Sequence, residues 1–230
     1  MLLYGPQKFR VLAFGGRYIQ VPKIHYDLKK QPLQDRAKFT VGVLKEAAAH
    51  ILREQGCEGL TTNKVAEKAG VSIGSLYQYF PSKESLIAEI KRDHFKDLRQ
   101  SMKAAYESVK DRPLEVIVKA FINASIEAHR LDPPLHKILS GDLSEFKIKE
   151  NDKSQNAVHA LVESLLTERK SELRDDINIP LATRLTYKVI EGVIHDAVLY
   201  EPDLLEEERF VDEVHQMVMV YLTGTDSAVN

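Results

Sequence analysis

The chain has 230 residues, 43% of them hydrophobic and 29% charged, which is enough for one large domain or two small ones with a buried core. No apolar run approaches the length of a membrane span, and the run "VLAF" near the N-terminus is too short for a signal peptide. The single cysteine, Cys57, excludes an internal disulfide and a zinc site built from thiolates. These features predict a soluble protein of a reducing compartment, most simply the cytoplasm, with no membrane partner.

Charge is divided unevenly along the chain. Residues 1–103 hold 18 of the 32 lysines and arginines but only 10 of the 34 aspartates and glutamates, a net charge of +8. The remaining residues carry −10, which leaves −2 overall. A basic first part favours contact with a polyanion, and an acidic second part favours a surface that stays away from it. Chance segregation of solvated charges is the alternative explanation.

Residues 1–33 lack helical periodicity and are interrupted by several glycines and prolines. The stretch "RYIQV" could form a short strand, but no obvious partner lies nearby. We expect a poorly ordered basic extension, or a start site assigned too far upstream, because the regular pattern begins only near Gln34.

From Gln34 on, apolar residues recur at helical spacing almost throughout. Gly56 and Gly70 are placed to close the first two helices, while Ser72 and Ser82 are placed to cap the third and fourth. The first four helices are expected at residues 35–55, 63–70, 72–80 and 84–106.

The second half of the chain continues in the same way. Five further helical segments are expected at about residues 113–129, 135–146, 153–173, 180–200 and 205–222, of which the second is a short helix or a turn. Residues 34–223 show no convincing strand, internal repeat or low-complexity tract. The fold class is therefore all-α.

The second expected helix passes into the third through the turn "GVS", in which Gly70 closes one helix and Ser72 caps the next. The small residues Ala69, Gly70 and Val71 let two helices cross closely at a steep angle, which is the helix-turn-helix arrangement. In that arrangement the third helix presents its N-terminal residues to DNA bases, while the second lies across the DNA backbone.

The composition of the third helix agrees with this use. Ser72 can cap the helix, whose N–H end then attracts a phosphate. Gly74 costs about 1 kcal/mol of helix stability relative to Ala, which makes sense if the backbone must approach another surface. Leu76 and Phe80, four residues apart, are expected to point into a small core.

The polar side chains of this helix suit two kinds of DNA contact. Ser75 and Gln78 can hydrogen-bond to base edges. Tyr77 and Tyr79 can bring hydroxyl groups to phosphate oxygens without adding charge, and Lys83 is placed for a phosphate.

The stretch "TTNKVAEKAGVSIGSLYQYFPSKESLIAEI" closely resembles the DNA-binding segment of TetR-family transcriptional regulators. It follows their pattern A-x-x-A-G-V-S-x-G-x-L-Y-x-[HY]-F-x-[SN]-K without a gap. The close match covers residues 36–90, and beyond them only length and helix count agree. The resemblance implies a ligand-responsive repressor that binds a palindromic operator as a homodimer, with its two third helices in successive major grooves.

The resemblance also assigns residue roles. It implies DNA contacts at Thr62, Ser72, Gly74, Ser75, Tyr77, Tyr79 and Lys83. Ile73 and Gln78 hold the variable positions that read sequence, and Ile73 departs from the lysine or arginine often found there, which favours an apolar contact such as a thymine methyl group. Arg36 and Lys38, with Lys29 and Lys30 upstream, either reach the flanking DNA backbone or are ordinary solvated cations.

In this family the divergent C-terminal helices form a dimer interface and a ligand pocket. The last two expected helices are the most apolar ones, which independently favours a four-helix interface between two copies, although an internal core would use the same residues. The candidate interface residues are Leu185, Val189, Gly192, Val193, Val214, Val218 and Tyr221.

Pocket candidates are aromatic and polar side chains on the helices that follow the third. They are Phe121, His129, His136, Phe146, His159, Glu163 and Tyr187. For each, ordinary core packing is the competing explanation. His159 and Glu163 are one helical turn apart, but no third ligand accompanies them, so we expect no metal and no cofactor.

The expected organisation is an extension at 1–33, a helix-turn-helix DNA-binding domain at 34–82, a helical ligand-binding and dimerisation domain at 83–223, and a tail at 224–230. Its expected partners are double-stranded operator DNA, an unknown small-molecule effector and a second copy of the chain. Two alternatives stay open: a DNA-associated protein without an effector, and a helical enzyme. The enzyme has little support, since the sequence contains no phosphate loop, nucleophile elbow, metal signature or cofactor fingerprint.

Overall fold

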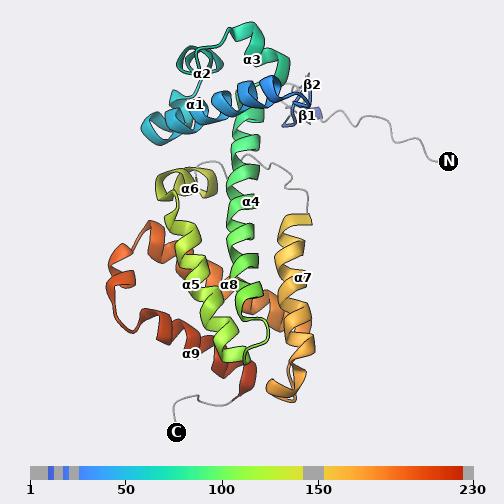
Figure 1. Cartoon of the computed structure of the whole chain (residues 1–230), viewed down its shortest axis with the longest axis vertical. Coiled ribbons are helices and arrows are strands. Elements are labelled where there is room, and N and C mark those ends of the chain that lie inside the picture. The colour runs from blue at the N-terminus through green and yellow to red at the C-terminus, as the bar shows by residue number, and fades with distance from the viewer. Residues whose placement is uncertain (1–9, 13–17, 21–25, 142–152, 225–230) are drawn as a thin grey trace, which may run out of the picture. The chain divides into compact units, whose positions relative to one another are not determined.

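The structure is a computed structural model that describes residues 10–12, 18–20, 26–141 and 153–224 (Figure 1). The chain divides into two compact units. The N-terminal unit comprises Met1–Ala48 and Leu60–Glu89, and the C-terminal unit comprises Ala49–Gly59 and Ile90–Asn230. The division falls inside the fourth helix, whereas the sequence predicted a boundary at residues 82–83. None of the helices in the described ranges is long and apolar enough to cross a membrane.

The extension contains a short antiparallel hairpin. Strand β1 (Arg10–Leu12) pairs with β2 (Tyr18–Gln20), and Arg10 lies opposite Gln20. The expectation that "RYIQV" has no partner is therefore wrong, because a three-residue strand shortly before it is enough to pair with it. The rest of the predicted disorder in residues 1–25 falls outside the described residues.

Three short-range signals set the helices of the N-terminal unit. Helix α1 (Asp35–Gly59) is interrupted at Gly56, which has φ of 64°, so the regular helix ends where the sequence predicted. Helix α2 (Thr62–Lys68) begins at Thr61, whose side chain accepts a hydrogen bond from the Lys64 N–H. The chain turns at Gly70, with φ of 66°, into helix α3 (Ile73–Tyr79).

The core of this unit is small and apolar. Val65 of α2 and Leu76 of α3 have no exposed surface, and Leu44 of α1 is equally buried. Phe80, which ends α3, is also fully buried. Four fully buried side chains of this size contribute on the order of 6–12 kcal/mol in total, which fixes α2 and α3 against each other.

Helix α4 (Lys83–Val109) starts with a serine pair in which Ser82 and Ser85 cap each other. The C-terminal unit takes the rest of α4 from Ile90, together with the end of α1. Its other elements are α5 (Leu114–Arg130), α6 (Pro133–Ser140), α7 (Lys153–Glu168), a 3-10 turn η1 (Lys170–Glu172), α8 (Ile179–Leu199), a second 3-10 turn η2 (Pro202–Glu206) and α9 (Phe210–Thr223). The helical fold class is confirmed in the described residues from Asp35 on.

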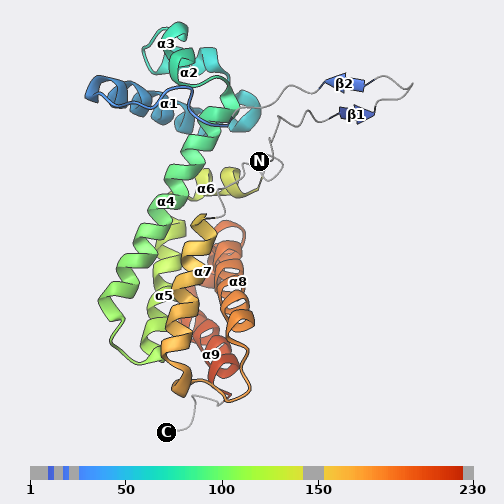
Figure 2. The same cartoon turned by 90° about the vertical axis from the view of Figure 1, so that its right-hand side faces the viewer.

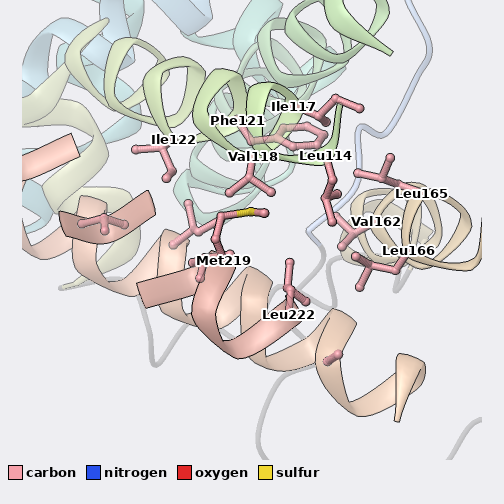
Figure 3. Packing of buried hydrophobic residues seen from close by; sticks show 14 of the residues in the cluster. Leu114, Ile117, Val118, Phe121, Ile122, Val162, Leu165, Leu166, Met219 and Leu222 are labelled. Atoms are coloured by element: carbon pink, nitrogen blue, oxygen red, sulfur yellow. The ribbon is translucent and has the colours of Figure 1, made fainter. Parts of the chain in front are cut away.

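Helix α8 packs against both α5 and α7, and α9 packs against α5 (Figure 2). Apolar side chains from α5, α7 and α9 point toward one another in the core (Figure 3). Met219 and Leu222 of α9 meet this core from one side, and Leu165 of α7 meets it from another. The core thus joins helices that lie far apart in the sequence.

Asp132 ties the beginning of α6 to the end of α1. Its carboxylate accepts hydrogen bonds from Arg53 at 2.9 Å and 2.6 Å and also caps α6 by accepting from the Leu135 N–H. A charge-assisted pair of this kind holds the loop after α5 in one conformation.

The final helix begins later than expected. Residues 202–206 form η2, and α9 starts only at Phe210 rather than near residue 205. Pro202 and Asp203 fit the tight first turn of a 3-10 segment, and the chain leaves helical geometry again at Glu207.

Candidate functional site

Helix α3 is anchored by its apolar side and leaves its other side exposed. Ser72 caps it by accepting a hydrogen bond from the Ser75 N–H at 3.0 Å, and the hydroxyl groups of the two serines lie 2.8 Å apart. Leu76 and Phe80 are fully buried, as predicted. The helix therefore cannot rotate about its axis without exposing its core residues.

The exposed side of α3 carries small, hydroxyl, amide and apolar groups. Ile73 is 39% exposed and Tyr77 is 44% exposed, and Gly74 and Gln78 are also exposed. A Cβ atom built at Gly74 would meet only the Ser72 hydroxyl oxygen, at 3.8 Å, so the described part of the chain leaves this surface open. Four of the predicted DNA-contacting residues thus share one accessible face.

The other predicted DNA contacts are also at least partly accessible. Ser72 and Arg36 are exposed, and the remaining ones, Thr62, Ser75, Tyr79 and Lys83, are partly exposed. The Thr62 hydroxyl lies 3.0 Å from the Tyr77 hydroxyl and links the first turn of α2 to α3. This hydrogen bond orients the Tyr77 ring before any partner arrives.

The chain before α1 contributes a contact that the sequence did not reveal. The backbone N–H of Lys29 donates a hydrogen bond to the carbonyl of Tyr79, the last residue of α3, at 2.8 Å. Lys29 and Lys30 are exposed, so two cations flank the end of α3. No periodicity in residues 26–33 could have predicted this pairing.

The C-terminal unit contains a cavity of about 450 Å³. Helices α4, α5, α7 and α8 supply most of its lining, and Leu222 of α9 completes it. A volume of this size is typical of a small-molecule site.

The predicted pocket residues divide into three groups. Phe121, His129, His136 and Tyr187 line the cavity. His159 and Glu163 are not part of the lining, because the His159 ring packs against Tyr187, with 4.7 Å between the ring centres, and Glu163 is exposed. Phe146 lies outside the described residues.

Four histidines from four helices meet beside one end of the cavity, and three of them, His129, His136 and His195, line it. Nε2 of His94 lies 2.7 Å from Nδ1 of His136, and the His136 ring lies 4.6 Å from that of His129 and 5.1 Å from that of His195. His94 and His195 are not among the predicted pocket residues. Each lies on a separate helix from the others, so no sequence spacing could reveal the cluster.

Burial favours the neutral form of His136. Together with the neighbouring His129, His94 and His195, it lowers the pKa of His136 to about 3. Burial also lowers the pKa of His129, whose Nδ1–H donates to the Ser125 carbonyl. No group of three or more His, Cys, Asp or Glu side chains in the described part of the chain is arranged to hold a metal ion.

The predicted interface residues do not share one exposed face. Leu185 and Val189 of α8 are 40% and 36% exposed, and Gly192 is exposed. Val193 and Tyr221 are half-buried against the core. Val214 and Val218 of α9 are 4% and 3% exposed, so the expectation that they form an open apolar face is wrong, because α9 turns them toward α5.

A short exposed helix, held across a glycine turn by a second short helix, is the arrangement of helix-turn-helix proteins. Two family models match the chain. The model for bacterial regulatory proteins of the tetR family matches residues 44–90, and the model for the tetracyclin repressor-like C-terminal domain matches residues 113–222. Together they cover more than half of the chain, which therefore belongs to the TetR family of bacterial regulatory proteins.

Among curated proteins, the nucleoid occlusion factor SlmA of Haemophilus ducreyi is 32% identical over 127 residues, which are 54% of this chain and 60% of that relative. The SlmA of Mannheimia succiniciproducens is 30% identical over 125 residues, which are 52% of this chain and 53% of that relative. The chain thus spans little more than half the length of these relatives.

Solved structures extend over more of the chain. The fatty acid degradation regulator FadR from Bacillus halodurans has a TM-score of 0.63 at 20% identity and covers 83% of this chain and 96% of that one. NalD, the secondary repressor of the MexAB-OprM multidrug efflux pump in Pseudomonas aeruginosa, has a TM-score of 0.64 at 18% identity and covers 83% and 98%. At these identities the likeness concerns the fold.

Proposed function

We propose that the chain is a DNA-binding transcriptional regulator of the cytoplasm, a ligand-responsive repressor that binds a palindromic operator as a homodimer. The observation that carries this proposal is the open face of α3, where Ile73, Gly74, Tyr77 and Gln78 lie together on a helix that its own core holds in place. Membership of the TetR family supports the same function.

The face suits DNA because it is itself uncharged and the same unit carries cations on other elements. Residues Ile73–Tyr79 contain no acidic or basic side chain, so neither repulsion from phosphates nor a strongly hydrated cation prevents close approach. Gln78 can read a base edge and Ile73 can contact a thymine methyl group. Lys83 and Arg36 belong to the same unit and can neutralise phosphates.

Gly74 has a specific part in this proposal. Gly74 has no Cβ atom and lies on the exposed side of α3. The α3 backbone can therefore come closer to a DNA strand at this position than it could with any other residue. This use explains a residue that lowers helix stability by about 1 kcal/mol relative to Ala.

The cavity supports the ligand-responsive part of the proposal. Its volume of about 450 Å³ and its mixture of apolar and polar side chains are those of a small-molecule site rather than of a packing defect. An effector acts on DNA binding only if it has different affinities for the DNA-competent and DNA-incompetent conformations. For the repressor proposed here, we expect the effector to bind the DNA-incompetent conformation more tightly and so to reduce operator affinity.

One pair of variants tests the DNA interface. Tyr79→Phe with Lys83→Ala removes phosphate contacts, so binding to all DNA should weaken alike and the salt dependence should become shallower. Gln78→Ala should instead change the preferred sequence. Fluorescence anisotropy with genomic fragments, followed by selection from a randomised operator library, measures both effects. Unchanged sequence preference for Gln78→Ala would show that this residue does not read bases.

A DNA-associated protein that needs no effector is the second candidate, since the curated relatives are nucleoid occlusion factors. In that case the cavity would serve no binding role.

Filling the cavity with Ser125→Leu or Val162→Phe separates the two functions, since both residues line the cavity. A variant that keeps full DNA affinity but has lost the wild type's response to cell extract supports the ligand-responsive regulator. Wild-type DNA binding that does not respond to the extract, or a response that both variants retain, supports the second candidate.

A further inference from the structure

The cavity is polar at one end and apolar at the other. Helices α4 and α5 are joined by a short connection and run in opposite directions. The part of α4 just after Ile90, where the C-terminal unit begins, therefore lies at the same end of the cavity as the end of α5. The ring contacts among His94, His136, His129 and His195 agree with this arrangement. Lys91 of α4 lies one turn before His94 and lines the same end.

The opposite end is lined by aliphatic and aromatic side chains. Leu114, Val118 and Phe121 of α5 face Val162, Leu165 and Leu166 of α7 (Figure 3). A ligand that fills this end must be apolar there, because no side chain among these six offers a hydrogen bond.

Two residues of the cavity lining each carry a buried polar atom that lacks a hydrogen-bond partner among the described residues. The two atoms are Nε2 of His136 and Oγ1 of Thr186, both inaccessible to solvent. His136 is 1% exposed, and its other ring nitrogen is occupied by His94. Leaving such groups unsatisfied is costly, so a ligand gains a hydrogen bond from them where a small side-chain movement opens them to the cavity.

The charges on the lining favour an acidic ligand. Lys91 and Arg99 line the cavity from α4, and no ion pair joins either of them to another residue of the described ranges. The Lys91 ammonium instead lies 5.7 Å above the Phe95 ring. Glu191 is the single carboxylate among the described lining residues, so the two cations leave an excess of positive charge.

We propose that the cavity binds an amphipathic carboxylic acid, with its acid group among His136, His129 and Lys91 and its apolar body between α5 and α7. A regulatory role for the acid rests on the proposed repressor function, whereas binding of the acid to the cavity does not depend on it. The Lys91 ammonium favours the acid over an amine, because a second cation in this place would be buried beside it with too few acceptors. An alcohol could satisfy one unpartnered atom but would leave the ammonium without a counter-charge.

The test uses probes that share an apolar body and differ in the head group. Decanoic acid, decanol and decylamine form one series, and naphthoic acid, naphthalenemethanol and naphthalenemethylamine form a compact one. Isothermal titration calorimetry with the full chain should show, in at least one series, an acid that binds about tenfold or more tightly than its alcohol and amine, as expected for a hydrogen bond to a charged group. An alcohol or amine that binds as tightly as the acid in both series, or no binding of either acid, overturns the proposal.

Two variants with matched controls locate the acid group. His136→Phe and Lys91→Gln should each reduce acid affinity about tenfold and leave the alcohol nearly unaffected. His159→Phe makes the same side-chain change beside the cavity but off its lining, and Lys103→Gln makes the same change on an exposed part of α4. Equal losses in a variant and its control would place the acid group elsewhere and refute the assignment.

A DNA-binding measurement in parallel keeps this inference separate from the proposed function. If the preferred acid binds but operator affinity does not change, the cavity assignment stands and the ligand-responsive repressor fails. If the acids do not bind and an amine releases the operator, the regulator stands and the assignment of an acid is wrong.

Discussion

Protonation of the buried histidine cluster should destabilise the protein as the pH falls. The pKa of His136 lies at about 3 in the folded chain, well below its ordinary value of 6.5, because the ring is buried and three histidines surround it. The unfolded chain therefore binds more protons than the folded chain at any pH between these two values. Stability conferred by the neutral ring is fully present above about pH 6.5 and is lost progressively toward about pH 3.

The size of the effect follows from the two pKa values. At about pH 5 the unfolded ring is mostly protonated and the folded ring is not, which costs about 2 kcal/mol of unfolding free energy relative to neutral pH. This loss is a large part of the marginal stability typical of a domain. Neighbouring His129, whose pKa is also lowered, adds a loss in the same direction.

Urea denaturation near pH 7.5 and near pH 5 measures this difference in the wild type and in His136→Phe. The variant should lose about 2 kcal/mol less than the wild type between these pH values, because its buried ring cannot be protonated. His50→Gln is the control, since His50 is partly exposed and paired with Glu54 on the surface. Equal pH-dependent losses in the wild type and His136→Phe would refute the view that this histidine is held neutral by the fold.

Three further variants test separate features. Lys29→Ala with Lys30→Ala should reduce the slope of log affinity against log salt by about two per subunit, because each phosphate contact contributes about 0.9. An unchanged slope would show that neither lysine contacts a phosphate. Leu185→Glu with Val189→Glu should produce monomers in sedimentation, since both side chains are exposed on α8 and charges buried in an interface are costly; folded dimers would place the interface elsewhere. Gly70→Ala should lower the unfolding free energy by about 1–2 kcal/mol, because its φ is +66° although no atom lies within 4 Å of the new Cβ; a urea midpoint equal to that of the wild type would contradict this expectation.

The helix-turn-helix can be predicted because its signals are local. A serine before α3, a glycine with positive φ before it, and the pair Leu76 and Phe80 four residues apart each act within one or two turns. The accessible face then follows by elimination, since a helix with one buried side must expose the other. No distant residue is needed for this deduction.

The C-terminal unit shows where such reasoning stops. The apolar stripe on α9 is visible in the sequence. The sequence does not show what the stripe packs against, because α5 of the same chain and a second copy of the chain would bury the same side chains. In the structure Val214 and Val218 face inward, whereas Leu185 and Val189 of α8 remain accessible. A double change of the two α9 valines to glutamate would therefore unfold the unit rather than separate a dimer.

The polar end of the cavity is also only partly predictable. The sequence suggests His129 and His136 as pocket residues, but their neighbours His94 and His195 lie more than thirty residues away along the chain. Their meeting depends on how α4, α5, α6 and α8 pack, and helix packing is set by the whole core.

Short strands are missed for a different reason, since three residues such as Arg10–Leu12 carry too little periodicity to be recognised.

The hydrogen bond from Lys29 to the Tyr79 carbonyl has a practical consequence for anyone who prepares this protein. The final carbonyls of a helix receive no N–H from the helix itself, so Lys29 supplies the donor at the end of α3. A recombinant version trimmed to begin at Gln34, or fused there to an affinity tag, would lack this donor, and the Tyr79 carbonyl oxygen would hydrogen-bond to water instead. Two laboratories that choose different N-terminal boundaries could then measure different operator affinities and attribute the discrepancy to buffer or DNA, when its source is a backbone amide outside the recognised motif.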